Sequence, residues 1–216
     1  MALHVDNIPL AQIAPRLNQR ALVVGQTGSG KSFLADRLVQ IHAAQGKYIV
    51  AHDGKDKLPE ESPFFRTFDR FTTLDDATRS RSRRILYAPN RAEEGDEEKQ
   101  NAFFEWIYRR RNTTLYVDEV GCVTYGTRIP DSYRAILTRG RQLGLACISG
   151  SQRPMDIPQL LLSEAEHYYV FRLQLPQDRK KVKAIFEFPD LKTLPPRYFY
   201  YAQANGAIIG PTTLKL

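Results

Sequence analysis

The sequence predicts an α/β fold in which helices cover a mainly parallel β-sheet. Short apolar runs typical of strands alternate along the 216 residues with amphipathic segments typical of helices. Runs such as ALVV (21–24) and LACIS (145–149) are apolar throughout, as in strands that are covered on both faces. The composition, 42% hydrophobic and 25% charged, is ordinary for a globular domain of this size.

The strands are expected where apolar and β-branched residues gather. In chain order, the expected strands are 21–24, 47–53, 85–89, 113–119, 145–149 and 167–173. The tail RYFYYAQANGAIIG resembles a β-hairpin that turns at Asn205–Gly206, because Asn-Gly favours the tight turns of hairpins. Residues 54–84 contain Pro59, Pro63 and a basic run, and are expected to be rich in loops.

The helices are expected between these strands. The spacing of Leu34, Leu38 and Ile41 predicts a helix over 30–44, and the aromatic face of 97–111 predicts another. The remaining expected helices are 131–142, 157–165 and 177–187. We expect one domain over 1–216, with a core at about 18–175 and a small C-terminal decoration at about 176–216.

The segment GQTGSGKS, from Gly25 to Ser32, satisfies every fixed position of the Walker A pattern GxxxxGK[ST] and lies between an expected strand and an expected helix. Its glycines let backbone N–H groups turn toward phosphate oxygens, and the helix adds its positive end. Lys31 is expected at the β- and γ-phosphates, and the Ser32 hydroxyl on Mg²⁺. The expected nucleotide-binding residues are Gly25, Gln26, Thr27, Gly28, Ser29, Gly30, Lys31 and Ser32.

An acidic pair, Asp118-Glu119, ends the apolar strand LYV, as in a Walker B motif. Asp118 suits a role in holding Mg²⁺, and Glu119 is placed to polarise the water that attacks the γ-phosphate. A kinase needs no base for water, so the pair favours hydrolysis of ATP. A GTPase would show [NT]KxD, and the nearest segment, GKDK (54–57), does not match.

A third constellation covers residues 137–154, LTRGRQLGLACISGSQRP. In the sheet of a P-loop motor ATPase, the strand of this segment lies between the strand before the phosphate loop and the strand that ends in Asp118-Glu119. This order would put Gln152 beside the γ-phosphate, where it could sense the loss of that phosphate. Arg139 or Arg141 could act as an arginine finger on a neighbouring subunit's nucleotide. The alternative is that both arginines are solvated at a helix end, where cations suit the helix dipole.

The run TRGRQLGL…SGSQRP, after GQTGSGKS and YVDE, resembles the FtsK/HerA superfamily of DNA-pumping ATPases over residues 18–175. Within it, the small size is most similar to the genome-packaging ATPases of tailless, membrane-containing viruses. The resemblance implies a RecA-like P-loop NTPase fold of the ASCE type, a ring (commonly a hexamer), and double-stranded DNA threaded through its centre. A capsid vertex or portal component is a further expected partner, in the host cytoplasm or on the virion. The SGSQ strand end differs from the ATQ that is common in the family.

Several basic segments could hold DNA, in keeping with the net charge of +7. Either of two clusters could contact phosphates without reading sequence. The first cluster is Arg79, Arg81, Arg83 and Arg84, and the second is Arg179, Lys180, Lys181 and Lys183. Each cluster singly could instead be a solubilising surface, or could pair with the acidic run Glu93–Glu98 across subunits.

Other features limit the alternatives. Cys122 and Cys147 lie in no Cys/His cluster, so no zinc site is expected. No apolar stretch reaches the length of a membrane span, and the first twenty residues lack the apolar segment of a signal peptide, so a cytoplasmic protein is expected. The expected function is ATP-driven translocation of double-stranded DNA. A conjugation or secretion motor, and a nucleotide-gated scaffold with little turnover, remain the alternatives.

Overall fold

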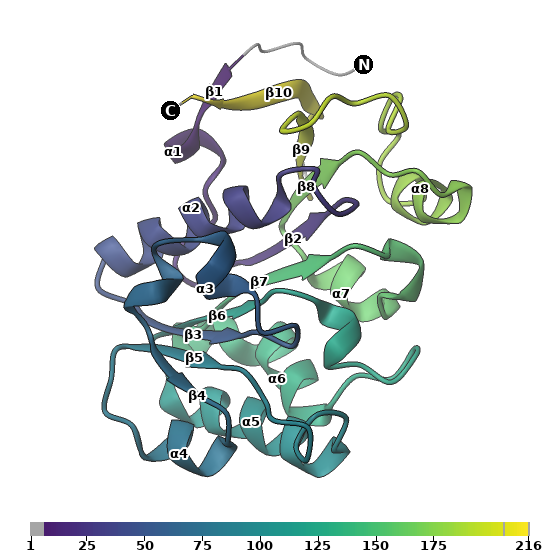
Figure 1. The fold of residues 1–216 in the computed structure, drawn as a ribbon. Coiled ribbons are helices and arrows are strands. Elements are labelled where there is room, and N and C mark those ends of the chain that lie inside the picture. The colour runs from purple at the N-terminus through teal and green to yellow at the C-terminus, as the bar shows by residue number, and fades with distance from the viewer. Residues whose placement is uncertain (1–6, 205, 216) are drawn as a thin grey trace.

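The structure is a computed structural model that describes residues 7–204 and 206–215. Within these residues, ten strands form one sheet in the order β1-β10-β9-β8-β2-β7-β6-β3-β5-β4, and helices cover both of its faces (Figure 1). The strands are β1 (Asn7–Pro9), β2 (Arg20–Val24), β3 (Tyr48–His52), β4 (Asp69–Phe71), β5 (Arg84–Tyr87), β6 (Thr113–Val117), β7 (Ala146–Ser151), β8 (His167–Phe171), β9 (Phe199–Gln203) and β10 (Ile209–Lys215). The helices are α1 (Leu10–Ile13), α2 (Lys31–Ala44), α3 (Leu58–Glu61), α4 (Leu74–Arg79), α5 (Glu97–Arg110), α6 (Asp131–Arg139), α7 (Gln159–Glu164) and α8 (Pro176–Lys183).

The seven strands in the order β8-β2-β7-β6-β3-β5-β4 run parallel to one another, which confirms the predicted α/β fold with a mainly parallel sheet. Strand β7 lies between β2 and β6, as the sequence predicted for the strand at 145–149. Because parallel strands end at the same edge, the segments after β2, β6 and β7 meet at the carboxyl edge of the sheet. This edge is where the expected nucleotide-binding residues lie.

The two faces of the sheet pack separate hydrophobic cores. Helices α1, α2 and α3 cover one face, where Leu34 and Leu38 are buried against strand residues such as Tyr169. Helices α4 to α7 cover the other face, where Phe104 of α5 stacks on Tyr133 of α6 with ring centroids 4.3 Å apart. Burial on both faces explains why the central strands are apolar throughout rather than alternating.

The C-terminal hairpin extends the main sheet. Strand β9 pairs antiparallel with β8, β10 pairs antiparallel with β9, and β1 pairs parallel with β10 at the sheet edge (Figure 1). The predicted hairpin is therefore confirmed, although Asn205 of the expected turn lies outside the described residues. The sequence did not predict β1, because three residues with one buried side chain, Ile8, carry no periodic signal.

The structure differs from the prediction in three other places. Residues 54–84 contain α3, α4 and the edge strand β4, which is short and mostly exposed and so lacks an apolar pattern. The helix expected over 131–142 ends at Arg139 and continues as a 3-10 helix, Gly140–Leu143. The helix expected over 177–187 spans Pro176–Lys183, and its start at a proline fits the preference of proline for the first helical turn.

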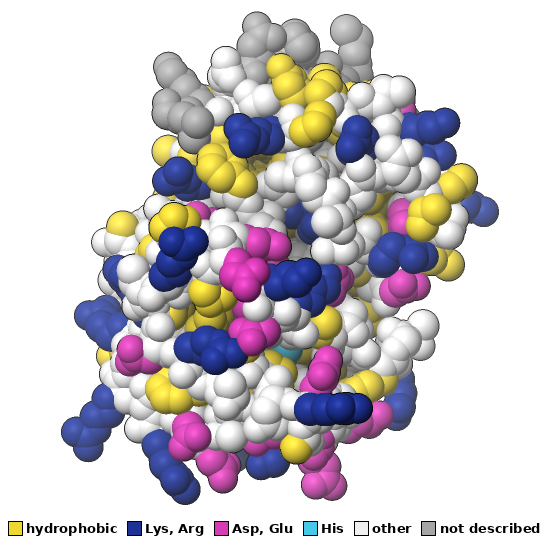
Figure 2. Space-filling model, in the orientation of Figure 1, with side chains coloured by type: hydrophobic (Ala, Val, Ile, Leu, Met, Phe, Trp, Pro, Cys, Tyr) yellow, Lys and Arg dark blue, Asp and Glu magenta, His cyan; other side chains and the backbone are white. Residues whose placement is uncertain are grey.

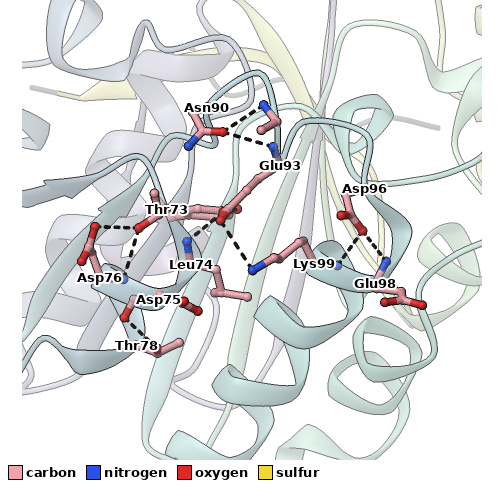
Figure 3. Close-up of polar contacts among 12 residues, drawn as sticks. Thr73, Leu74, Asp75, Asp76, Thr78, Asn90, Glu93, Asp96, Glu98 and Lys99 are labelled. Carbon is pink, nitrogen blue, oxygen red and sulfur yellow. Dashed lines mark hydrogen bonds and ion pairs between the residues drawn. The ribbon is translucent and has the colours of Figure 1, made fainter.

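Several side chains of the acidic run Glu93–Glu98 form polar contacts within this chain (Figure 3). Glu93 accepts hydrogen bonds from the Leu74 N–H at 2.8 Å and from the Tyr87 hydroxyl at 2.7 Å. Asp96 caps α5 by accepting from two backbone N–H groups, those of Glu98 and Lys99. These contacts fix the loop before α5 and leave Glu94 and Glu98 exposed.

Candidate active site

The phosphate loop connects β2 to α2 at the carboxyl edge of the sheet. Gly28 and Gly30 have φ angles of 74° and 111°, in the left-handed region that glycine adopts without strain. Gly25 has no space for a side chain, because a Cβ there would lie 2.5 Å from the Cβ of Phe171. The first turn of α2 has no side-chain cap on its N–H groups, so these donors are free to bind an anion.

A pocket of about 520 Å³ opens over this loop. Its size suits a nucleotide. Lys31 is half-buried in it, and burial lowers the pKa of Lys31 below its ordinary value, although the carboxylates of Asp118 and Glu119 oppose this shift. The pocket is lined by Thr27, Gly28, Gly30, Lys31, Ser32, Phe33, Glu61, Gln152, Pro196 and Arg197.

Asp118 follows β6 and faces the same region. Its Oδ1 accepts a hydrogen bond from the hydroxyl of buried Tyr116 at 2.7 Å. Burial raises the pKa of Asp118, and the hydrogen bond from Tyr116 and the charge of Lys31 oppose that rise. The negative charges of Asp53 and Glu61 raise it further, so a cation beside Asp118 would relieve an unfavourable concentration of negative charge.

Glu119 is 8% exposed and lies next to Asp118. Its carboxylate accepts from the Lys55 Nζ at 3.0 Å and from the backbone N–H of Gln152 at 3.1 Å. Glu119 lines a second pocket of about 260 Å³, which it shares with Lys55 and Gln152. Gln152 lines both pockets, so it stands between Glu119 and the phosphate loop.

The Gln152 side chain contacts the phosphate loop directly. Its Oε1 accepts a hydrogen bond from the Thr27 hydroxyl at 3.0 Å, across 125 residues of sequence. Together with the bond from its N–H to Glu119, this contact links the two predicted motifs. A ligand that displaced the Thr27 hydroxyl would therefore disturb a residue that also holds Glu119.

The donor set fits Mg²⁺. Ser32 and Asp118 offer oxygen ligands, which Mg²⁺ prefers, and a nucleotide-bound Mg²⁺ takes one or two protein ligands with phosphates and water completing its shell. Among the described residues, no group of three or more His, Cys, Asp and Glu side chains could form a metal site by itself. Such a cluster is not needed where the phosphates supply ligands.

The two candidate arginine fingers lie away from this pocket. Arg139 and Arg141 precede β7, at the amino edge of the sheet, about 20 Å from the end of β7 at about 3.3 Å per residue. Arg141 pairs with Glu166, which also contacts Arg20 at 3.4 Å. Both arginines are exposed, and at this distance from the pocket either could act as a finger only for a site on another chain.

The two predicted DNA-binding clusters lie at opposite edges of the sheet. The first, Arg79 to Arg84, is exposed at the amino edge, where the Arg83 guanidinium stacks over Tyr48 and the Arg84 guanidinium over Phe64. On the face that Figure 2 shows, basic side chains are interspersed with acidic ones and form no continuous band.

The second cluster lies on α8, beside the carboxyl edge. Arg179 and Lys181 donate to backbone carbonyl groups, Lys181 to those of Met155 and Ile157 just after Gln152. Lys180 and Lys183 are exposed. An ion pair between Arg153 and Asp178, 3.3 Å long, fixes α8 to the same segment, so α8 is packed on the chain that follows β7.

Two residues that the sequence did not single out border the site. Lys55 pairs with Glu119, and the only available signal was a basic residue shortly after a strand end. Arg197 reaches the phosphate loop from the C-terminal part of the chain, and its N–H donates to the Ser29 carbonyl at 2.8 Å. No local pattern connects residue 197 with residue 29.

Within the described part of the chain, no helix has the length and apolarity needed to cross a membrane.

No protein-family model matches the chain. A curated relative, the DNA packaging ATPase P9 of Enterobacteria phage PRD1, is 27% identical over 173 residues, covering 78% of this chain and 70% of that protein. The genome packaging NTPase B204 of Sulfolobus turreted icosahedral virus 2, solved with sulfate, matches with a TM-score of 0.73 and 19% identity over 90% of this chain and 96% of that one. VirB4 of Thermoanaerobacter pseudethanolicus matches with a TM-score of 0.69 and 12% identity over 91% and 89%.

The sequence likeness and the structural likeness agree with the motifs. The P9 match covers most of the chain, and the B204 and VirB4 matches give the same fold at low sequence identity. The predicted resemblance of this chain to the ATPases of viral genome packaging, and to P-loop ATPases of the FtsK/HerA type, is therefore confirmed.

Proposed function

We propose that this chain is a viral genome-packaging ATPase that hydrolyses ATP and uses the energy to translocate double-stranded DNA. The observation that carries the proposal is the hydrogen-bonded chain from the phosphate loop through Gln152 to Glu119. The likeness to P9, a DNA packaging ATPase, supports the choice of cargo. Structures of B204 with ATPγS and with AMPPCP support ATP as the nucleotide.

In the proposed reaction, the phosphate loop and Lys31 bind the β- and γ-phosphates. Ser32 and Asp118 would hold Mg²⁺, which neutralises charge on the phosphates. Glu119 takes a proton from the water whose oxygen attacks the γ-phosphorus, and the bond to the β-phosphate oxygen breaks to give ADP and phosphate. For this step Glu119 exchanges its contact with Lys55 for one with water.

Gln152 is the proposed link between nucleotide and cargo. It contacts Thr27 of the phosphate loop, and the segment that follows it carries α8 through the Arg153–Asp178 ion pair. Loss of the γ-phosphate would change the contacts of Gln152. The segment after Gln152 would then move α8, and with it the exposed side chains of Lys180 and Lys183. In a hexameric ring, the favoured assembly, Arg139 or Arg141 would complete the neighbouring subunit's site.

Hydrolysis by the purified full chain, with and without linear double-stranded DNA, tests this proposal. We expect DNA to stimulate turnover and added salt to reduce the stimulation, because phosphate contacts release counterions. Glu119→Gln should lower turnover about 10²- to 10⁴-fold while ATP still binds. The control is Glu98→Gln, which removes the charge of an exposed glutamate on α5 and should leave turnover unchanged.

Each other outcome has a definite meaning. Full activity in Glu119→Gln would remove Glu119 from the mechanism. Turnover that does not change when DNA is added, at any salt concentration, would favour a secretion or conjugation motor. ATP binding without turnover in the wild-type chain would favour a nucleotide-gated scaffold. The mass of the assembly with DNA and a non-hydrolysable analogue tests the ring.

A further inference from the structure

We propose that Arg197 is a nucleotide-binding residue of the same subunit, whose guanidinium contacts the α- and β-phosphates of the bound nucleotide. The inference rests on the proposed ATP site and adds a residue that lies far from every motif in the sequence. The segment that carries Arg197 connects α8 to β9 and crosses over the phosphate loop.

The backbone of Arg197 is held against the middle of the loop. Its N–H donates to the Ser29 carbonyl at 2.8 Å, and a Cβ at Gly30 would lie 3.2 Å from the Arg197 Cα. The N–H groups in this part of a phosphate loop bind the α- and β-phosphates. Arg197 and Pro196 line the same pocket as Lys31 and Ser32, so Arg197 borders the space in which the phosphates would bind.

The conformation of Arg197 is one that arginine rarely adopts. Residues 195–198, Pro-Pro-Arg-Tyr, form a turn in which the Tyr198 N–H donates to the Pro195 carbonyl at 3.2 Å. Arg197 has a φ of 69° at the third position of this turn, where a proline at the second position and a positive φ at the third are typical of type II turns and glycine is favoured. Strain of this kind is found at functional sites when the side chain is required.

The guanidinium is available for a ligand. Arg197 is exposed, and within residues 7–204 and 206–215 its side chain has no hydrogen bond or ion pair. A second arginine beside the loop differs in this respect. With the Gln26 amide oxygen turned toward Arg172, the Arg172 Nε and Nη2 donate to it at 2.9 and 2.8 Å. A planar guanidinium beside a phosphate site can bind phosphate oxygens in a bidentate manner.

The experiment compares Arg197→Gly and Arg197→Lys with the wild-type chain in equilibrium binding of ATP, ADP and AMP. Glycine removes the side chain and suits the positive φ, so the turn and the fold should be kept, which a melting temperature checks. We expect the dissociation constants of Arg197→Gly for ATP and ADP to rise together, about ten- to hundredfold, and that for AMP to rise less. Arg197→Lys should recover part of the affinity.

Arg91→Gly is the control, because Arg91 is an exposed arginine in the loop after β5, four strands from β2 in the sheet. It should bind all three nucleotides like the wild type. Unchanged ATP and ADP affinity in Arg197→Gly would overturn the inference, as would an equal loss for AMP, which would indicate contact with the base or ribose. If the wild-type chain itself bound no ATP, the proposed function would fail; if it bound ATP and Lys31→Ala did not, only the role of Arg197 would be in question.

Discussion

Replacement of Gly150 by alanine tests how the acidic strand is positioned. Gly150 lies in β7, and a Cβ there would be 2.3 Å from the Asp118 carbonyl oxygen and 3.4 Å from the Val117 carbonyl oxygen. Carbon and oxygen atoms that are not bonded to each other approach to about 3.3 Å, so the end of β6 would have to move by about 1 Å. Both obstacles are backbone atoms, which cannot rotate away as a side chain could.

The expected cost has two parts. Forcing a methyl group into a packed interior destabilises a protein by about 1–3 kcal/mol, which corresponds to a loss of about 2–12 °C in melting temperature for a domain of this size. Displacing Asp118 by about 1 Å should also lower turnover by up to about 100-fold, because catalytic geometry tolerates little misplacement.

Calorimetry and a hydrolysis assay measure the two parts. The control for stability is Gly121→Ala, since a Cβ at Gly121 would lie 3.8 Å from the nearest atom outside its chain neighbours, Oε1 of Glu119, and its φ is not left-handed. Wild-type melting temperature and turnover in Gly150→Ala would show that β6 and β7 do not approach each other as described. An equal loss of stability in Gly121→Ala would show that the effect is not specific to the contact with Asp118.

Two further predictions concern stability. Glu93→Ala should lower the free energy of unfolding, measured by urea denaturation, by about 2–4 kcal/mol, because it leaves the Leu74 N–H and the Tyr87 hydroxyl buried without an acceptor. The control is Glu94→Ala, which removes an exposed carboxylate and should change the free energy of unfolding little. Equal effects of the two substitutions would contradict the role of Glu93. Burial lowers the pKa of His52 from 6.5 to about 4, so the unfolded chain binds the proton more tightly than the folded chain does. The contribution of neutral His52 to the free energy of unfolding is therefore complete above about pH 6.5, and about 3 kcal/mol of it is lost as the pH falls toward 4. Between pH 7 and pH 4, the free energy of unfolding measured by denaturation should fall by this amount less in His52→Phe than in the wild type. An identical fall in both proteins would refute the prediction.

The sequence predicted the central sheet because the strands that build it are buried on both faces and so are apolar throughout. It also predicted which strand ends would meet, because the phosphate loop, Asp118 and Gln152 each follow such a strand. The edge strands β1 and β4 were missed because they are short and are defined by their partners rather than by their own side chains.

The contacts that complete the site were beyond local patterns. Lys55 and Glu119 are 64 residues apart, and their ion pair depends on the pairing of β3 with β6 in the sheet. Arg197 occupies a position where turn chemistry favours glycine, so a propensity argument would have counted against it. The assignments of the metal ligands, the arginine finger and the DNA-binding clusters stay predictions.

The phosphate loop precedes by more than 100 residues several of the segments that it contacts, so these segments are synthesised later. Thr27 bonds to Gln152, the Gln26 N–H donates to the Arg172 carbonyl, and Ser29 accepts from Arg197. During synthesis the loop would emerge from the ribosome long before these partners, and pairing of such distant segments is slow because the intervening chain must first be closed into a loop. A nascent chain would therefore hold no finished nucleotide site until the segment through residue 197 had been made and had folded onto the phosphate loop.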